Sequence, residues 1–230
     1  MAQRAEQVTA GRVVVPARPS RLRIGRTYLP SLEVATARWA LPLAESRQAV
    51  CRDGLGLVEM GGLVAGDTSS AAVFVIDPLS GAVRATGSLT EAVHDAAAAC
   101  LGDEAIVFGG GSFNTVGAVQ AWSGSGKARV VGALPVPRSD LTAVAVAVGR
   151  TAYVVGGFDG AAMQPTVLAT TDGAHFKLAG RLKVGVRYPA VAARGGYIWV
   201  AGGQAGTSEG VGDRPTSSSV STRARAKRPS

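Results

Sequence analysis

Four short polar segments recur along the chain, each four to six residues after a leucine. Aligned on Leu41, Leu89, Leu134 and Leu182, these lead-in segments are Glu45-Ser46-Arg47, Val93-His94-Asp95, Arg138-Ser139-Asp140 and Val186-Arg187-Tyr188. Glu45, His94 and Arg187 have the side-chain types of a general acid, a general base and an anion anchor. The same segments would alternatively bind a ligand, through Arg47, His94, Asp95, Arg138, Ser139, Asp140 and Arg187. A third interpretation is that these side chains only cap strand ends.

The adjacent pair His94 and Asp95 is not expected to act as a catalytic dyad, because neighbouring residues on a strand point to opposite faces. His175 follows a turn and is expected on the surface. Cys51 and Cys100 form neither a CxxC pair nor a disulfide framework, so buried free thiols are expected. The sequence predicts no metal site and no cofactor.

Two glycine-rich segments resemble nucleotide-binding loops but lack required residues. "GGGSFNTVG" (109–117) has Asn114 where a dinucleotide-binding turn needs its third glycine, and a strand-like run follows instead of a helix. "SGSGK" (123–127) is followed by Ala128, where a phosphate-binding loop needs Ser or Thr. Both segments are therefore predicted to be turns.

The turns belong to a repeat that runs through most of the chain. Double glycines stand at Gly61-Gly62, Gly109-Gly110, Gly156-Gly157 and Gly202-Gly203, at spacings of 48, 47 and 46 residues. An apolar run precedes each pair ("GLVEM", "AIVF", "AYVV", "YIWVA"), and before it come a turn and a second run ("QAVC", "AAAAC", "LTAVAVAV", "PAVAA"). After the first three pairs, two more runs follow, separated by a turn. Each full unit is thus predicted to be four short antiparallel strands.

A four-stranded unit cannot cover both faces of its sheet alone, so successive units should stack face to face. This period and strand number, with the "GGFDG" and "LPVPRSD" segments of the third unit, resemble bacterial kelch repeats, the blades of a β-propeller. The resemblance covers 41 to about 203. The fourth strands depart from it, with Val83, Ala128 and Phe176 where kelch units usually carry Trp. In kelch substrate adaptors, Arg and Ser of the lead-in contact a bound peptide, and Arg138 and Ser139 match that placement.

The expected fold class is all-β, with about four kelch-type blades in an incomplete ring and disordered basic termini. The expected organisation is a basic arm at 1–27, blades over 28–203, and a disordered Ser/Thr/Arg-rich tail at 204–230. The blades comprise repeat 1 (41–88), repeat 2 (89–133), repeat 3 (134–181) and a partial repeat 4 (182–203), with 28–40 as candidate outer strands of a preceding blade. Two explanations fit the low count. The chain is a truncated propeller, which is our expectation, or it completes itself by association.

The net charge of +8 lies entirely at the two ends, because 27–203 holds 13 basic and 13 acidic residues. No aromatic residues interleave with the terminal arginines, so a nucleic-acid partner is not expected. No apolar run is long enough to span a membrane. The missing signal peptide favours the cytoplasm, whereas the resemblance to bacterial kelch proteins allows an exported or cell-surface setting.

The expected function is that of a non-enzymatic interaction module, which binds a protein or glycan through its channel-end loops. The alternatives are a sugar-processing propeller enzyme, similar to a sialic-acid mutarotase, and a non-functional remnant of a longer propeller. A copper radical oxidase is not expected, because two scattered histidines cannot supply its ligand set.

Overall fold

The computed structural model describes residues 34–206, except 53, 55, 147–149 and 195, and the strand backbone at 23–24, 27–28 and 222–225. The chain divides into two compact parts, Met1–Arg38 and Trp39–Ser230. The first contains a small hairpin of β1 (Arg23–Ile24) and β2 (Thr27–Tyr28). The rest of the predicted arm at 1–27 lies outside the described residues. Within the candidate outer strands at 28–40, residues 34–40 form no strand, and 29–33 lie outside the described residues.

The second part is all-β in its described residues, and every predicted run is a strand. Repeat 1 contains β3 (Ala49–Arg52), β4 (Leu57–Met60), β5 (Leu63–Val64), β6 (Thr68–Ser69), β7 (Ala72–Ile76) and β8 (Val83–Ser88). Repeat 2 contains β9 (Ala97–Leu101), β10 (Glu104–Gly111), β11 (Thr115–Trp122), β12 (Gly126–Lys127) and β13 (Arg129–Ala133). Repeat 3 contains β14 (Thr142–Val146), β15 (Thr151–Val155), β16 (Thr166–Thr170) and β17 (Lys177–Arg181). Repeat 4 contains β18 (Val186–Arg187), β19 (Ala190–Arg194) and β20 (Tyr197–Ala201), and β21 (Gln204–Ala205) and β22 (Thr222–Arg225) follow it.

Each of repeats 1 to 3 builds one antiparallel sheet with its four main strands in chain order, for example β14-β15-β16-β17. In repeat 4, β20 is the central strand and pairs with β19 on one side and with β22 on the other. The segment 204–230, predicted to be disordered, thus supplies β21 and β22, because the open edges of β18 and β20 offer backbone partners; its remaining residues from 207 on lie outside the described ones.

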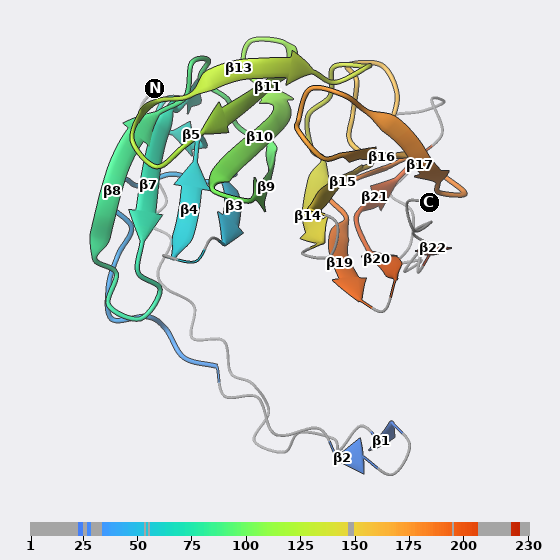
Figure 1. The fold of residues 1–230 in the computed structure, drawn as a ribbon, viewed down its shortest axis with the longest axis horizontal. Coiled ribbons are helices and arrows are strands. Elements are labelled where there is room, and N and C mark those ends of the chain that lie inside the picture. Colours follow the sequence, from blue (N-terminus) through green and yellow to red (C-terminus); the bar gives the residue numbers. More distant parts are fainter. Residues whose placement is uncertain are drawn as a thin grey trace, which may run out of the picture. The chain divides into compact units, whose positions relative to one another are not determined.

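Successive sheets pack face to face, and the first main strand of each repeat lies next to the first main strand of the following repeat. Strand β3 contacts β9, β9 contacts β14, and β14 contacts β19, and all four lie on the inner side of the arc in Figure 1. We call the face of a repeat toward the preceding repeat its leading face, and the face toward the next repeat its trailing face. Three apolar clusters fill the contacts between repeats 1 and 2, 2 and 3, and 3 and 4. The hydrophobic core therefore lies between sheets, as the stacking prediction requires.

The first glycine of each pair marks the closest approach between repeats. Gly109 has φ +59°, and a Cβ there would lie 2.4 Å from the carbonyl oxygen of Arg138 in the next repeat. Gly61 and Gly156 are crowded in the same way by the carbonyl oxygens of Val93 and Val186, again at 2.4 Å. Glycine is required here both by its φ and by the neighbouring backbone.

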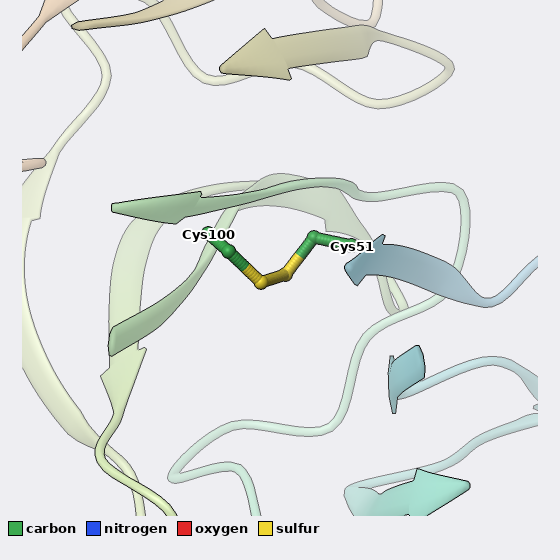
Figure 2. Close-up of a disulfide and its surroundings, with 2 residues drawn as sticks. All are labelled: Cys51 and Cys100. Carbon is green, nitrogen blue, oxygen red and sulfur yellow. A yellow bond between two sulfur atoms is a disulfide. The ribbon is translucent and has the colours of Figure 1, made fainter. Parts of the chain in front are cut away.

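Cys51 and Cys100 form a disulfide between β3 and β9, with their Cα atoms 5.6 Å apart (Figure 2). The prediction of free thiols was therefore wrong. Cys51 lies on the trailing face of repeat 1 and Cys100 on the leading face of repeat 2, so stacking brings the two sulfurs together. A crosslink that closes a loop of 49 residues stabilises a fold by about 4 kcal/mol in the chain-entropy model. Repeats 1 and 2 are thus joined covalently as well as by packing.

Candidate functional site

The four lead-in segments are held together by a backbone hydrogen-bond chain across the repeats. Asp95 N–H donates to the carbonyl oxygen of Arg47 at 3.1 Å, Asp140 N–H to Asp95 at 2.8 Å, and Tyr188 N–H to Asp140 at 2.8 Å. All four residues are left-handed, with φ between 51° and 59°. Aspartate tolerates this conformation, but Arg47 and Tyr188 adopt it only where the surrounding structure enforces it. The same position of every repeat is thereby brought into one row.

The side chains of this row form two ion pairs between neighbouring repeats. Arg47 Nη1 lies 3.0 Å from Asp95 Oδ2, and Arg187 Nη1 lies 3.4 Å from Asp140 Oδ2. The carboxylates are mostly covered, with 8% and 7% of their side chains exposed, whereas 51% of Arg47 and 30% of Arg187 remain exposed. The surface therefore presents two guanidinium groups, each already paired with an acid beneath it.

Burial and nearby charge act together on the titration of the row. Burial raises the pKa of Asp95, and the Asp140 carboxylate raises it further, while Arg47 lowers it. Burial and the hydrogen bond to Asp140 raise the pKa of Tyr188 to about 12. The phenol therefore keeps its proton at neutral pH and can donate it in a hydrogen bond.

Tyr188 is a member of the site that the candidate residues did not include. Tyr188 is 49% exposed as a residue, and the Arg187 guanidinium carbon lies 5.5 Å from the centroid of its ring and 5.7 Å from that of Phe158. Arg187 Nε also donates to Gln204 Oε1 at 2.8 Å. The signal that could have identified Tyr188 is its phase, because it stands six residues after Leu182, as Asp140 does after Leu134.

His94 lies at the edge of the row and contacts repeat 1. Its Nδ1 is 2.9 Å from Ser69 Oγ, whereas its Nε2 is 3.9 Å from Asp95 Oδ2, too far for a hydrogen bond. The expectation that His94 and Asp95 form no ready-made dyad agrees with this distance. His175 is 88% exposed in its side chain and lies on the surface, as expected.

Glu45 is separated from the other two members of the candidate catalytic set. No hydrogen bond or ion pair among the described residues joins Glu45, His94 and Arg187 to one another. Glu45 instead lies beside Glu59, and burial, followed by repulsion from Glu59, raises the pKa of Glu45. The structure thus groups Glu45 with a second carboxylate, not with a base.

Arg138 and Ser139 occupy the lead-in of repeat 3 but differ in accessibility from Arg47. Arg138 is only 2% exposed, and its Nη1 donates to the carbonyl oxygen of Gly156 and to Thr166 Oγ1, both at 3.0 Å. Burial lowers its pKa. Ser139 pairs through its backbone with Phe158. In this conformation Arg138 supports the strand ends and cannot reach a ligand, so we do not include it in the binding surface.

A hollow of about 340 Å³ lies beside Phe113 and is lined by Glu91 and residues 112–118. Phe113 itself is 98% exposed. The segment "GGGSFNTVG" that borders the hollow continues directly into β11, as predicted. Residues 123–127 form the turn before β13, with β12 paired to β8 of repeat 1. Neither segment is followed by the helix that a nucleotide-binding loop requires.

The described residues contain no group of three or more His, Cys, Asp or Glu side chains able to hold a metal ion. The described part of the chain has no helix with the length and apolar composition needed to cross a membrane. No model of a known protein family matches this chain, and no curated protein matches it.

Proposed function

We propose that the chain is a kelch-type propeller protein that works as a non-enzymatic interaction module. The repeat period, the sheet topology and the double glycines at the contacts between repeats support this proposal. Its binding surface is the row of Arg47, Asp95, Asp140 and Tyr188, together with Arg187.

The observation that carries the proposal is the backbone chain that joins the same lead-in position of all four repeats. It sets exposed polar groups from different repeats on a rigid support, which lowers the entropic cost of binding. The exposed groups are guanidinium N–H donors and a phenol ring, which suit the carbonyls, carboxylates and hydroxyls of a peptide or glycan. The partner is therefore a protein or a glycan.

A selection experiment tests the surface without knowledge of the partner. A random peptide library and an immobilised glycan panel are screened with the wild-type chain, and the binders are measured against the double variant Arg47→Ala/Arg187→Ala. The matched control is Arg84→Ala/Arg129→Ala, because these arginines also pair with acids, Asp77 and Glu104, but lie on outer strands. We expect the first variant to lose at least about tenfold in affinity and the control to lose little. Binders that keep full affinity for Arg47→Ala/Arg187→Ala would contradict the proposal.

The disulfide is evidence about the cellular compartment in which the protein works. Disulfides persist mainly in oxidising surroundings, and the Cys51–Cys100 pair therefore favours the exported setting over the cytoplasm.

A further inference from the structure

The contact between successive repeats is built from the same parts each time. The N–H of the second glycine donates to the next lead-in, as Gly62 does to Val93 at 2.8 Å, Gly110 to Arg138 at 3.0 Å and Gly157 to Val186 at 2.8 Å. The leucine that opens the next repeat is buried in the contact, with exposures of 2% for Leu89, 4% for Leu134 and 7% for Leu182. In all three contacts, the trailing face of one repeat packs against the opening leucine of the next repeat and donates a hydrogen bond to a carbonyl oxygen of its lead-in segment.

Repeat 4 has such a trailing face, and it is open. No described residue lies within 4 Å of the place where a Cβ on Gly202 would stand, whereas Gly61, Gly109 and Gly156 each receive a carbonyl oxygen there. Exposure alternates along β19 and β20, as expected for strands with one uncovered face. On that face Ala190, Ala192 and Ala201 are exposed, and Trp199 is 44% exposed. The equivalent of Trp199 in repeat 3 is Tyr153, which is 9% exposed against repeat 4. The open face is apolar apart from Arg194 at the end of β19, and it is in phase with three covered ones.

Repeat 1 has the complementary half, and it is open as well. Leu41 is 39% exposed, unlike the other three leucines, and Val50 on the same leading face is 48% exposed. Arg47 N–H, at the start of the backbone chain of the row, donates to no backbone carbonyl among the described residues. One buried carboxyl oxygen each of Glu45 and Glu59, the Oε2 atom, also has no hydrogen-bond partner among the described residues. One chain thus carries both halves of the contact, each without its counterpart in the described structure.

We propose that the trailing face of repeat 4 docks the leading face of repeat 1 of a second copy, head to tail. Leu41 of one copy then takes beside Gly202 of the other the place that Leu89 takes beside Gly61. A contact of this type joins two different surfaces, so it closes into a ring of copies or continues along a chain of them. Of the two explanations for the low blade count, the open faces favour self-completion, and this inference does not depend on the proposed ligand surface.

Light scattering coupled to size-exclusion chromatography tests the contact on the full chain. We expect a mass of about 46 kDa, twice the 23.2 kDa of the chain, or a larger multiple. Leu41→Asp and Trp199→Glu should each shift the chain to the monomer. The matched control is Leu79→Asp, because Leu79 is 92% exposed in the turn between β7 and β8, outside the strands of both faces, and should leave the mass unchanged.

Mixing the variants distinguishes this contact from other modes of association. Leu41→Asp retains an intact trailing face and Trp199→Glu an intact leading face, so an equimolar mixture should regain a heterodimer that neither variant forms alone. If Leu41→Asp misfolds by circular dichroism, Val50→Asp replaces it. A wild-type monomer at all concentrations overturns the proposal. So does a dimer that Trp199→Glu abolishes while Leu41→Asp and Val50→Asp leave it intact, because that outcome means contact between two trailing faces.

Discussion

Repeats 3 and 4 carry the same strands in the same phase, yet they are buried differently. In β15, four successive residues from Ala152 to Val155 are buried, because repeats 2 and 4 cover both faces of the sheet. In β20, Ile198 and Val200 are buried against repeat 3, while Trp199 and Ala201 on the trailing face are exposed. The comparison shows that a repeat gains its stability from its neighbours, one face at a time.

Repeat 1 shows the complementary difference on its leading face. Repeats 2, 3 and 4 place Val107, Val154 and Val200 against the preceding repeat, and all three are buried in the clusters. Repeat 1 has Glu59 at the same position, only 4% exposed. A carboxyl group therefore stands where the other contacts are apolar.

The largest expected effect is a difference in the free energy of unfolding between two substitutions of the first glycine of a pair, one where the next repeat covers the glycine and one where no described residue does. In Gly156→Ala, the new methyl group would lie 2.4 Å from the carbonyl oxygen of Val186, at φ +67°. We expect a loss of roughly 3–5 kcal/mol in the free energy of unfolding, from clash and backbone strain together. Gly202→Ala has similar strain at φ +64° but no described neighbour, so its loss should be about 1–2 kcal/mol.

Urea unfolding measures both variants, with the chain dilute enough to be monomeric. The midpoints are compared at equal slope, so that only stability differs. Equal losses in the two variants would mean that a neighbour covers Gly202 as closely as repeat 4 covers Gly156.

The second effect is pH-dependent and concerns the leading face of repeat 1. Burial raises the pKa of Glu59 above its ordinary value of 4.5, although a hydrogen bond from Gln48 opposes the shift. The folded state therefore holds its proton more tightly than the unfolded chain, and stability falls as the pH rises from 4.5 through the folded pKa. Glu45, whose pKa is also raised, lies beside Glu59, and Ser70 is its neutral hydrogen-bond partner.

Glu59→Gln should remove part of this dependence. The amide can still accept from Gln48 and can donate toward Glu45, so we expect the variant to be about 1 kcal/mol more stable than the wild type at pH 7. Near pH 4 the two should differ little. The control is Glu104→Gln, which removes a partly exposed carboxyl paired with Arg129 and should change stability by less than about 1 kcal/mol at either pH. A Glu59→Gln gain of the same size at both pH values would exclude titration as its cause.

The repeat period of the sequence predicted the strands and the double-glycine turns, because these depend on local apolar runs and on glycine. The lead-in alignment also named Arg47, Asp95 and Asp140, which the backbone chain joins to Tyr188. Propeller closure and ligand binding by these residues stay predictions.

The features that the sequence did not predict depend on which face of a sheet a residue lies on and on what the neighbouring sheet places opposite it. Cys51 stands ten residues after Leu41 and Cys100 eleven after Leu89, so the two side chains lie on facing sides of adjacent sheets and meet, which the pattern within a single repeat does not predict. Arg138 matched a family position, but its equivalents Val93 and Val186 are buried, which indicates an inward-facing place. The left-handed φ of Tyr188 could not be predicted from its residue type, because tyrosine rarely adopts this conformation.

The smallest effect, at Gly180, is expected to have the opposite sign to that of the equivalent substitution at Gly132 in the preceding repeat. Gly132 and Gly180 both stand two residues before the leucine that opens the next repeat, on β13 and β17. A Cβ on Gly132 would lie 2.7 Å from Ala174 Cα in the third-to-fourth-strand turn of repeat 3, whereas no described residue lies within 4 Å of that place on Gly180. Neither glycine has a left-handed φ, so crowding alone distinguishes them.

Gly132→Ala should therefore cost about 1–3 kcal/mol, because the turn must move to admit the methyl group. Gly180→Ala should stabilise the fold by about 0.4–1 kcal/mol, because alanine restricts the unfolded chain and fits the open place. Thermal unfolding of the two variants against the wild type measures both. Opposite signs would mean that the outer half of repeat 3 lacks the cover that repeat 3 gives to repeat 2. A loss in Gly180→Ala comparable to that in Gly132→Ala would instead mean that a turn of repeat 4 closes over β17, and the asymmetry between the repeats would then be confined to their inner strands.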